Sequence, residues 1–220
     1  MNDLATGVTG WLFIAAAAMW WLGWTFLPAK VGPFFEAADF ERVRSRLRLW
    51  IWMYRVNLFG YLITLMAFVA FATLVAGSEY RIILWPAVAT LGAGLLVGVL
   101  AAAFYYHFGA WGAVDLDGKP SEAVDAYVES LEVSTEYVTC FVRFGRVFFG
   151  FGQVILAIGL LLSGLLPIWL IVGGAVLGAA AMVVTMAVGE NLKIFEPLFH
   201  LNAAWLAAIG VVVLVSGVNL

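Results

Sequence analysis

The chain has 220 residues, of which 65% are hydrophobic and 11% are charged, and its formal net charge is −3. Soluble domains are nearer half apolar and a quarter charged. This composition, with a mean hydropathy of +1.03, therefore excludes an ordinary soluble domain and predicts an integral membrane protein. Nucleic-acid-binding surfaces are strongly basic, so the net negative charge also argues against a nucleic-acid partner.

Six segments are apolar enough to cross a bilayer as helices, which takes about 20 residues. In chain order they cover residues 10–27, 49–76, 82–106, 147–165, 168–188 and 199–218. Little chain remains between them, so we expect residues 1–220 to form one all-α transmembrane bundle. The first segment has no basic leader and no small-residue cleavage site, which favours a retained span over a signal peptide.

Basic residues gather on one side of these spans. Ten of them fall in the segments after spans one, three and five or just inside the adjoining span ends, whereas Arg81 stands alone on the other side: Lys30, Arg42, Arg44, Arg46, Arg48, Arg55, Lys119, Arg143, Arg146 and Lys193. By the positive-inside rule we place these ten in the cytoplasm of a bacterium. Both termini are then expected on the outer, periplasmic side of the inner membrane. Trp20 and Trp50 lie at predicted span ends, which is typical of interfacial anchors.

The first cytoplasmic segment, residues 35–50, is expected to be helical and to continue directly into the second span. Its arginines repeat at helical spacing, as Arg44 and Arg48 show. Such a cluster at a membrane surface attracts anionic lipid headgroups. The bilayer itself is therefore one predicted partner.

The second cytoplasmic segment contains a predicted amphipathic helix over about residues 121–143. Residues 115–120 have the composition of a turn, and Ser121 is a suitable N-cap. Five carboxylates then recur at steps of three and four, which places them on one helical face: Glu122, Asp125, Glu129, Glu132 and Glu136. An apolar stripe of Val124, Tyr127, Val128, Leu131 and Val138 lies on another face. The acidic stripe is either a solvated face, a docking surface for a basic partner or a cation site.

Ionisable side chains near the membrane gather at one predicted level, the cytoplasmic ends of the spans: Arg55, Arg143, Arg146, Glu190, Glu196, His107 and His200. The two histidines are the only ones in the chain. On facing helices their imidazoles would hold the iron of a haem b, or with nearby carboxylates they would bind another metal ion. No spacing motif specifies either site, and no catalytic arrangement is present. Structural histidines at the interface are the alternative.

The middle of every span lacks charged residues, which argues against an ion-coupled transporter. Two pairs of glycines are spaced four apart within spans, namely Gly94 with Gly98 and Gly174 with Gly178. This spacing permits close approach of helix backbones. We expect these pairs to pack helices together, within the bundle or against another subunit. The single cysteine, Cys140, is expected to be a buried, unreactive thiol.

The last third of the chain carries two stretches, GLLLSGLLPIWLIVGGAVLGAAAMVV from residue 159 and EPLFHLNAAWLAAIGVVVL from residue 196. They resemble uncharacterised bacterial integral membrane proteins with six predicted helices, in which a similar Ser-Gly-Leu-Leu-Pro turn joins two spans. This resemblance implies a helical bundle and no specific activity.

Three functional hypotheses follow from the sequence. The first is a non-catalytic accessory, scaffolding or assembly subunit that binds other membrane subunits or a second copy of itself. The second is a haem- or metal-binding redox protein that uses His107 and His200. The third is a binder or carrier of a lipid-like or quinone-like molecule.

Overall fold

The computed structural model describes residues 2–25, 40, 43–75, 79–188 and 192–216. Its helices are α1 (Asn2–Thr25), α3 (Leu47–Leu74), α4 (Arg81–Phe104), the π-helix η1 (Tyr105–Trp111), α5 (Gly112–Asp115), α6 (Ser121–Ser163), α7 (Ile168–Ala187) and α8 (Leu192–Ser216). Within these ranges, six helical segments are long and apolar enough to span a membrane. The described residues contain no strand. The chain is therefore an all-α, multi-pass membrane protein, as the sequence predicts.

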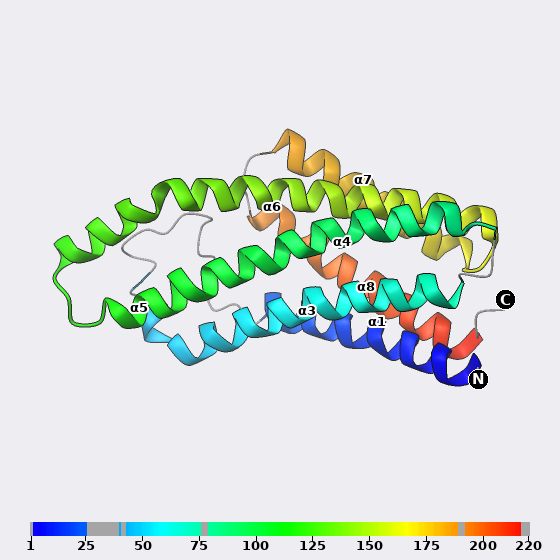
Figure 1. The fold of residues 1–220 in the computed structure, drawn as a ribbon, viewed down its shortest axis with the longest axis horizontal. Helices are drawn as coiled ribbons and strands as arrows, with labels where there is room; N and C mark the ends of the chain where they lie inside the picture. Colours follow the sequence, from blue (N-terminus) through cyan, green and yellow to red (C-terminus); the bar gives the residue numbers. More distant parts are fainter. Residues whose placement is uncertain (1, 26–39, 41–42, 76–78, 189–191, 217–220) are drawn as a thin grey trace.

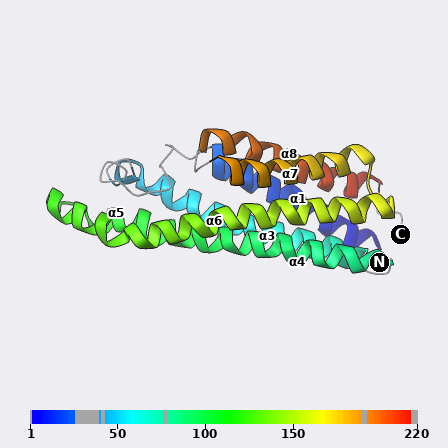
Figure 2. The ribbon, with the colours of Figure 1, turned by 90° about the horizontal axis from the view of Figure 1, so that it is seen from above.

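The six long helices form a closed ring in which each packs against two neighbours. Around the ring the order is α1, α3, α4, α6, α7 and α8, and α8 packs against α1 again. Figures 1 and 2 show these helices side by side, with the start of α1 and the end of α8 at the same end of the bundle. We call this the terminal end. The opposite end, where α3 and α6 begin and where η1 and α5 lie, is the extended end.

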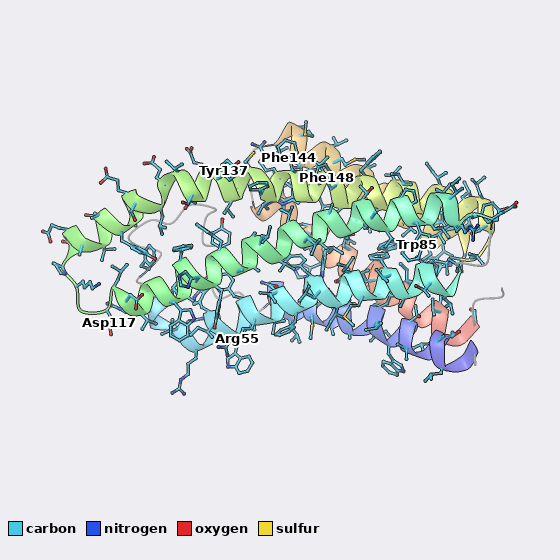
Figure 3. The ribbon with its side chains drawn as sticks, in the orientation of Figure 1. Arg55, Trp85, Asp117, Tyr137, Phe144 and Phe148 are labelled. Carbon is cyan, nitrogen blue, oxygen red and sulfur yellow. The ribbon has the colours of Figure 1, made fainter. Side chains whose placement is uncertain are left out.

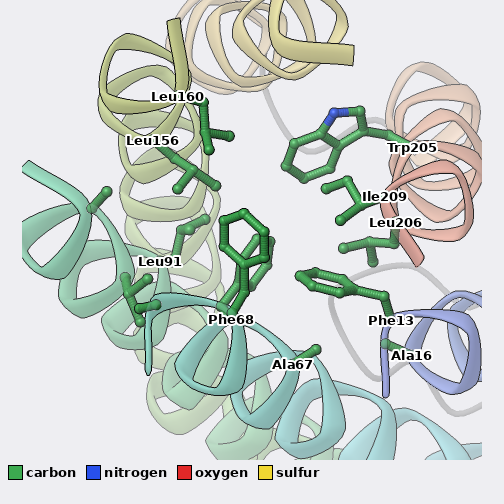
Figure 4. Packing of buried hydrophobic residues seen from close by; sticks show 14 of the residues in the cluster. Phe13, Ala16, Ala67, Phe68, Leu91, Leu156, Leu160, Trp205, Leu206 and Ile209 are labelled. Atoms are coloured by element: carbon green, nitrogen blue, oxygen red, sulfur yellow. The ribbon is translucent and has the colours of Figure 1, made fainter. Parts of the chain in front are cut away.

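Apolar side chains from all six long helices fill the centre of the ring. Phe68 of α3 meets Phe13 of α1 with ring centroids 5.2 Å apart, and Trp205 of α8 at 6.1 Å. Figure 4 shows Leu91 of α4 and Leu156 of α6 on one side of Phe68, with Phe13 and Trp205 on the other. The interior of the bundle is thus a packed hydrophobic core.

Helix α6 is much longer than a membrane is thick. Its 43 residues span about 64 Å at the α-helical rise, against a hydrocarbon core of about 30 Å. The predicted amphipathic helix and the predicted fourth span are therefore two halves of one helix. The predicted third span likewise continues beyond Tyr106, through η1 and α5. Together these helices form a hairpin that projects from the extended end (Figure 1).

Two local predictions at the helix starts are wrong by small shifts. Helix α6 begins at Ser121, so Pro120 occupies the N-cap position, and Ser121 does not. Residues 43–45 are helical, but the backbone leaves helical geometry at Arg46, with φ −135°, before α3 begins. The first basic segment, which is the predicted cytoplasmic segment over residues 35–50, therefore does not run directly into the second span.

Two tryptophans that we predicted at the membrane surface lie in the interior. Trp20 is buried against Phe149 and Tyr61, and its indole N–H donates to Thr64 Oγ1 at 3.1 Å. Trp50 is also buried, in a second apolar cluster. Their interfacial role is thus contradicted, because tertiary partners cover the rings and a hydroxyl satisfies the Trp20 nitrogen.

Candidate interaction surface at the extended end

A second hydrophobic cluster holds the projecting hairpin together. Its buried members come from the first basic segment and from α3, α5, α6 and the turn between α5 and α6: Phe40, Val43, Trp50, Ala113, Leu116 and Leu131. Val124, Tyr127 and Val128 of the predicted apolar stripe pack against them. The apolar stripe of α6 therefore faces the protein.

Tyr127 fastens α6 to the other arm of the hairpin. Its hydroxyl donates to the carbonyl oxygen of Phe108 in η1 at 3.2 Å, and its ring lies 5.6 Å from that of Phe40. A Cβ on Gly112 would lie 2.6 Å from the Tyr127 hydroxyl oxygen, so only glycine fits there without a shift. At the tip, Arg44 pairs with Asp117 at 3.0 Å. These contacts hold the two arms of the hairpin together.

Two arginines lie near the start of the membrane-crossing parts of α3 and α6. Arg55 of α3 and Arg143 of α6 each lie about 20 residues, the length of a membrane crossing, before their helix ends at the terminal end. Arg55 donates to the Tyr106 hydroxyl from Nε at 3.3 Å and from Nη2 at 2.9 Å, and it lies 5.4 Å from the centre of the Trp52 ring. We take the level of Arg143 as the boundary of the hydrocarbon region. The contacts of Gly98 with Tyr61 and of Gly94 with Gly145 place Arg55 somewhat further toward the extended end.

The other predicted boundary residues follow the same pattern where they are described. Arg143 donates to the Thr185 carbonyl of α7 at 3.5 Å, and the Arg146 guanidinium lies 4.0 Å above the Phe195 ring of α8. Glu196 is half-buried near the start of α8, and Glu190 lies outside the described residues. Aromatic faces and carbonyls thus hold these arginines at the boundary.

The outer face of α6 carries acidic and apolar side chains together. All five predicted carboxylates, from Glu122 to Glu136, are exposed. Among them Val133 is 77% exposed and Tyr137 67% exposed, and both precede Arg143. Exposed phenylalanines continue the row past Arg143 at Phe144 and Phe148 (Figure 3), and Phe151 is exposed as well. We call Glu129, Glu132, Val133, Glu136 and Tyr137 the acidic–aromatic face.

The structure places the two histidines on helices that do not pack together. His107 is exposed in η1, with its ring 4.8 Å from that of Phe108, and η1 packs against α3, α4 and α5. His200 is half-buried on α8, whose neighbours are α1 and α7. Within the described part of the chain, no three His, Cys, Asp or Glu side chains form a group able to hold a metal ion. A haem or metal site remains a prediction from the sequence.

The bundle interior contains a polar pair that the sequence does not predict. Gln153 of α6 donates to Asn202 Oδ1 of α8 at 2.7 Å, and Asn202 donates to the Leu198 carbonyl at 2.8 Å. Both residues are buried. The side-chain amide of Asn202 in the apolar sequence of α8 could have indicated such a pair, because a polar group needs a hydrogen-bond partner inside a membrane.

The four predicted packing glycines all lie at helix contacts, but the two glycines of each pair contact different helices. Gly94 approaches the backbone of Gly145 in α6, whereas Gly98 meets the Tyr61 ring of α3. Similarly, Gly178 faces Gly150 of α6 and Gly174 faces the Trp205 indole of α8. Helix packing within the bundle thus accounts for these glycines.

Cys140 lies on the outer side of α6 and is exposed. The predicted burial of this thiol is therefore wrong. No neighbouring helix of the described chain covers this part of the α6 surface.

No family model, curated protein or solved structure matches this chain. The resemblance of the last third to six-helix bacterial membrane proteins therefore stays a prediction.

Proposed function

We propose that this chain is a non-catalytic scaffolding or accessory subunit of a larger membrane complex, and that it binds its partners through the extended end. The observation that carries this proposal is the exposure of Val133 and Tyr137, at 77% and 67%, among carboxylates on α6. Both side chains lie beyond Arg143, on the side away from the hydrocarbon region. Bilayer contact therefore does not account for their exposure.

The charge of this surface favours a protein over a lipid as the partner. Glu129, Glu132 and Glu136 surround the apolar side chains and are exposed. Anionic lipid headgroups repel carboxylates, whereas an apolar centre with a charged rim is the common design of a protein interface. A basic or mixed partner surface satisfies both features.

The second hydrophobic cluster supports the same proposal. Leu131 is buried beneath the acidic–aromatic face, and Tyr127 is hydrogen-bonded to η1. The face is therefore presented on a braced helix, which lowers the entropy that a partner must remove on binding. A scaffold requires this kind of preorganised surface.

The proposal includes an orientation in a bacterial inner membrane. Arg44, Arg46, Arg48 and Lys119 lie at the extended end, and Arg81 lies at the start of α4 at the terminal end. The positive-inside rule then puts the extended end in the cytoplasm. In a Cys140→Ser background, a membrane-impermeant maleimide applied to intact cells is expected to label Ser216→Cys and to spare Gly118→Cys. The reverse pattern would overturn this orientation.

The scaffold proposal is tested by extracting the tagged protein in native lipid discs and measuring particle mass. We expect particles that contain more than one protein chain. The double variant Val133→Ser/Tyr137→Ser is expected to shift the mass toward the monomer, while Leu4→Ser, an exposed apolar residue at the terminal end, leaves it unchanged. A monomer under all conditions, without any bound protein, would contradict the proposal.

A further inference from the structure

We infer that one partner of the acidic–aromatic face is a second copy of this chain, bound through the outer face of its α3. This inference rests on the proposed function and names the partner. The two surfaces differ, so the contact would join the α6 of one copy to the α3 of the next. The evidence is that the two surfaces carry opposite charges, both expose apolar side chains, and lie at the same height along the bundle.

The start of α3 carries the complement of the acidic–aromatic face. Arg46 and Arg48 are exposed, and neither has an ion-pair partner among the described residues. Beside them Trp52 is 60% exposed and Leu49 lies at the surface. We call these four residues the basic–aromatic face. Each face thus combines charges of one sign with exposed apolar side chains.

The two faces lie at the same height. Trp50 of α3 and Leu131 of α6 belong to one buried cluster, which aligns the two helices above the boundary. Below the boundary, Gly92 and Gly94 of α4 touch Leu65 of α3 and Gly145 of α6, respectively. Since Arg46 and Arg48 precede Trp50 while Glu129 and Glu132 flank Leu131, the opposite charges are level with each other.

Helix direction permits the contact between copies that sit in the membrane in one orientation. Both α3 and α6 run from the extended end to the terminal end, and α4 lies between them (Figure 1). Figure 3 places Arg55 of α3 on one edge of the molecule and Tyr137 of α6 on the opposite edge. Two different faces that meet between equally oriented copies generate a ring or an open row of subunits.

Crosslinking through the native cysteine tests this arrangement. Cys140 is exposed on α6 just past the acidic–aromatic face, and Phe59 is exposed on α3 just past Arg55. We expect Phe59→Cys to give a ladder of oxidised oligomers in membranes. A pair within one copy is disfavoured because α4 separates the helices. The ladder should disappear when Cys140→Ser is added, and wild-type protein should stay monomeric.

The matched control is Trp21→Cys on α1. Trp21 is exposed and follows Met19 and Trp20, which contact Gly60 of α3, so it lies at the height of Phe59 on another helix. It should give no ladder with Cys140. A ladder from Trp21→Cys as strong as that from Phe59→Cys would show random collision and overturn the inference.

Charge reversal provides the second test. Like charges across an interface suppress pairing, so Arg46→Glu/Arg48→Glu in the Phe59→Cys background should lower the ladder by about tenfold. Glu129→Arg/Glu132→Arg should do the same, and combining all four changes should restore it. A combined variant that folds but does not recover would contradict the charge match.

The remaining outcomes separate this inference from the proposed function. If Phe59→Cys gives no ladder while a different protein binds and depends on Tyr137, the copy-to-copy contact is wrong and the scaffold proposal stands. Crosslinking through Cys140 alone would indicate a symmetric α6–α6 contact instead. If neither copies nor other proteins bind, both proposals fail.

Discussion

At the scale of single residues, side chains that look interfacial in the sequence are used inside the bundle. Trp20 and Trp50 have the positions of membrane anchors, yet both are buried. Thr64 accepts the Trp20 N–H and itself donates to the Gly60 carbonyl at 2.7 Å. Polar atoms in a membrane interior require partners, and here the Trp20 nitrogen finds its partner in a hydroxyl of a neighbouring helix.

The Gln153–Asn202 pair leads to a prediction of non-additivity. Gln153→Leu and Asn202→Leu each leave the other amide buried without its partner, whereas the double variant removes both. Interhelical hydrogen bonds in membranes contribute about 0.6 kcal/mol on average and up to about 1.7 kcal/mol. We therefore expect thermal melts in detergent to show a smaller loss for the double variant than the sum of the two single losses. Simple additivity would mean that the bond contributes nothing.

Gly94 leads to a second prediction at this scale. A Cβ there would lie 2.5 Å from the Gly145 carbonyl oxygen and 2.7 Å from the Phe149 nitrogen, both backbone atoms. Gly94→Ala should therefore force α4 and α6 apart and cost about 1–3 kcal/mol, the usual range for overpacking. Gly173→Ala is the control, because its nearest neighbour would be 3.9 Å away. Equal melting temperatures for the two variants would refute the close contact.

At the scale of elements, α6 joins two regions of different chemistry in one helix. The sequence changes from amphipathic to fully apolar near Arg143 without a proline, so no local signal ends the helix there. It ends instead at Gly164, where φ is +64° and glycine avoids the steric cost of a left-handed residue. The second hydrophobic cluster then stabilises the half that leaves the membrane.

This division predicts local unfolding of the hairpin. Leu131→Ala should remove packing from the second cluster and raise amide hydrogen exchange over residues 121–131, while exchange in α7 and α8 stays the same. Val133→Ala is the matched control, because Val133 is exposed on the same helix. If Leu131→Ala accelerates exchange throughout the bundle, the hairpin and the bundle unfold as one unit.

At the scale of the whole molecule, the ring closes where α8 meets α1. Gly10 of α1 and Gly210 of α8 approach each other through their backbones, as Gly94 and Gly145 do at the α4–α6 contact. These two contacts join the first three spans to the last three. Aromatic side chains then fill the centre that the ring encloses (Figure 4).

The central core predicts a difference between two phenylalanines of α3. Phe68→Ala should lower stability strongly, because Phe68 packs against both Phe13 and Trp205. When the helices separate in a membrane, lipid surrounds the Phe68 ring, so its burial in the bundle contributes less than burial from water. We therefore expect a loss near ~3 kcal/mol, the lower limit for buried phenylalanines in soluble proteins. Phe59→Ala, at an exposed position, should change the melting temperature little. Similar losses for both would argue against the packed centre.

The sequence by itself determined the membrane class, the number of spans, the one-sided distribution of basic residues and the amphipathic pattern of α6, because these depend on hydropathy and on helical periodicity. Only the tertiary structure decided which helices are neighbours. The hydrogen-bond partners of Trp20, Gln153 and Asn202 lie on other helices of the ring. The same arrangement places His107 and His200 on helices that do not pack together. It also set Arg46 and Arg48 level with Glu129 and Glu132, since α4 packs between α3 and α6 and fixes their relative heights.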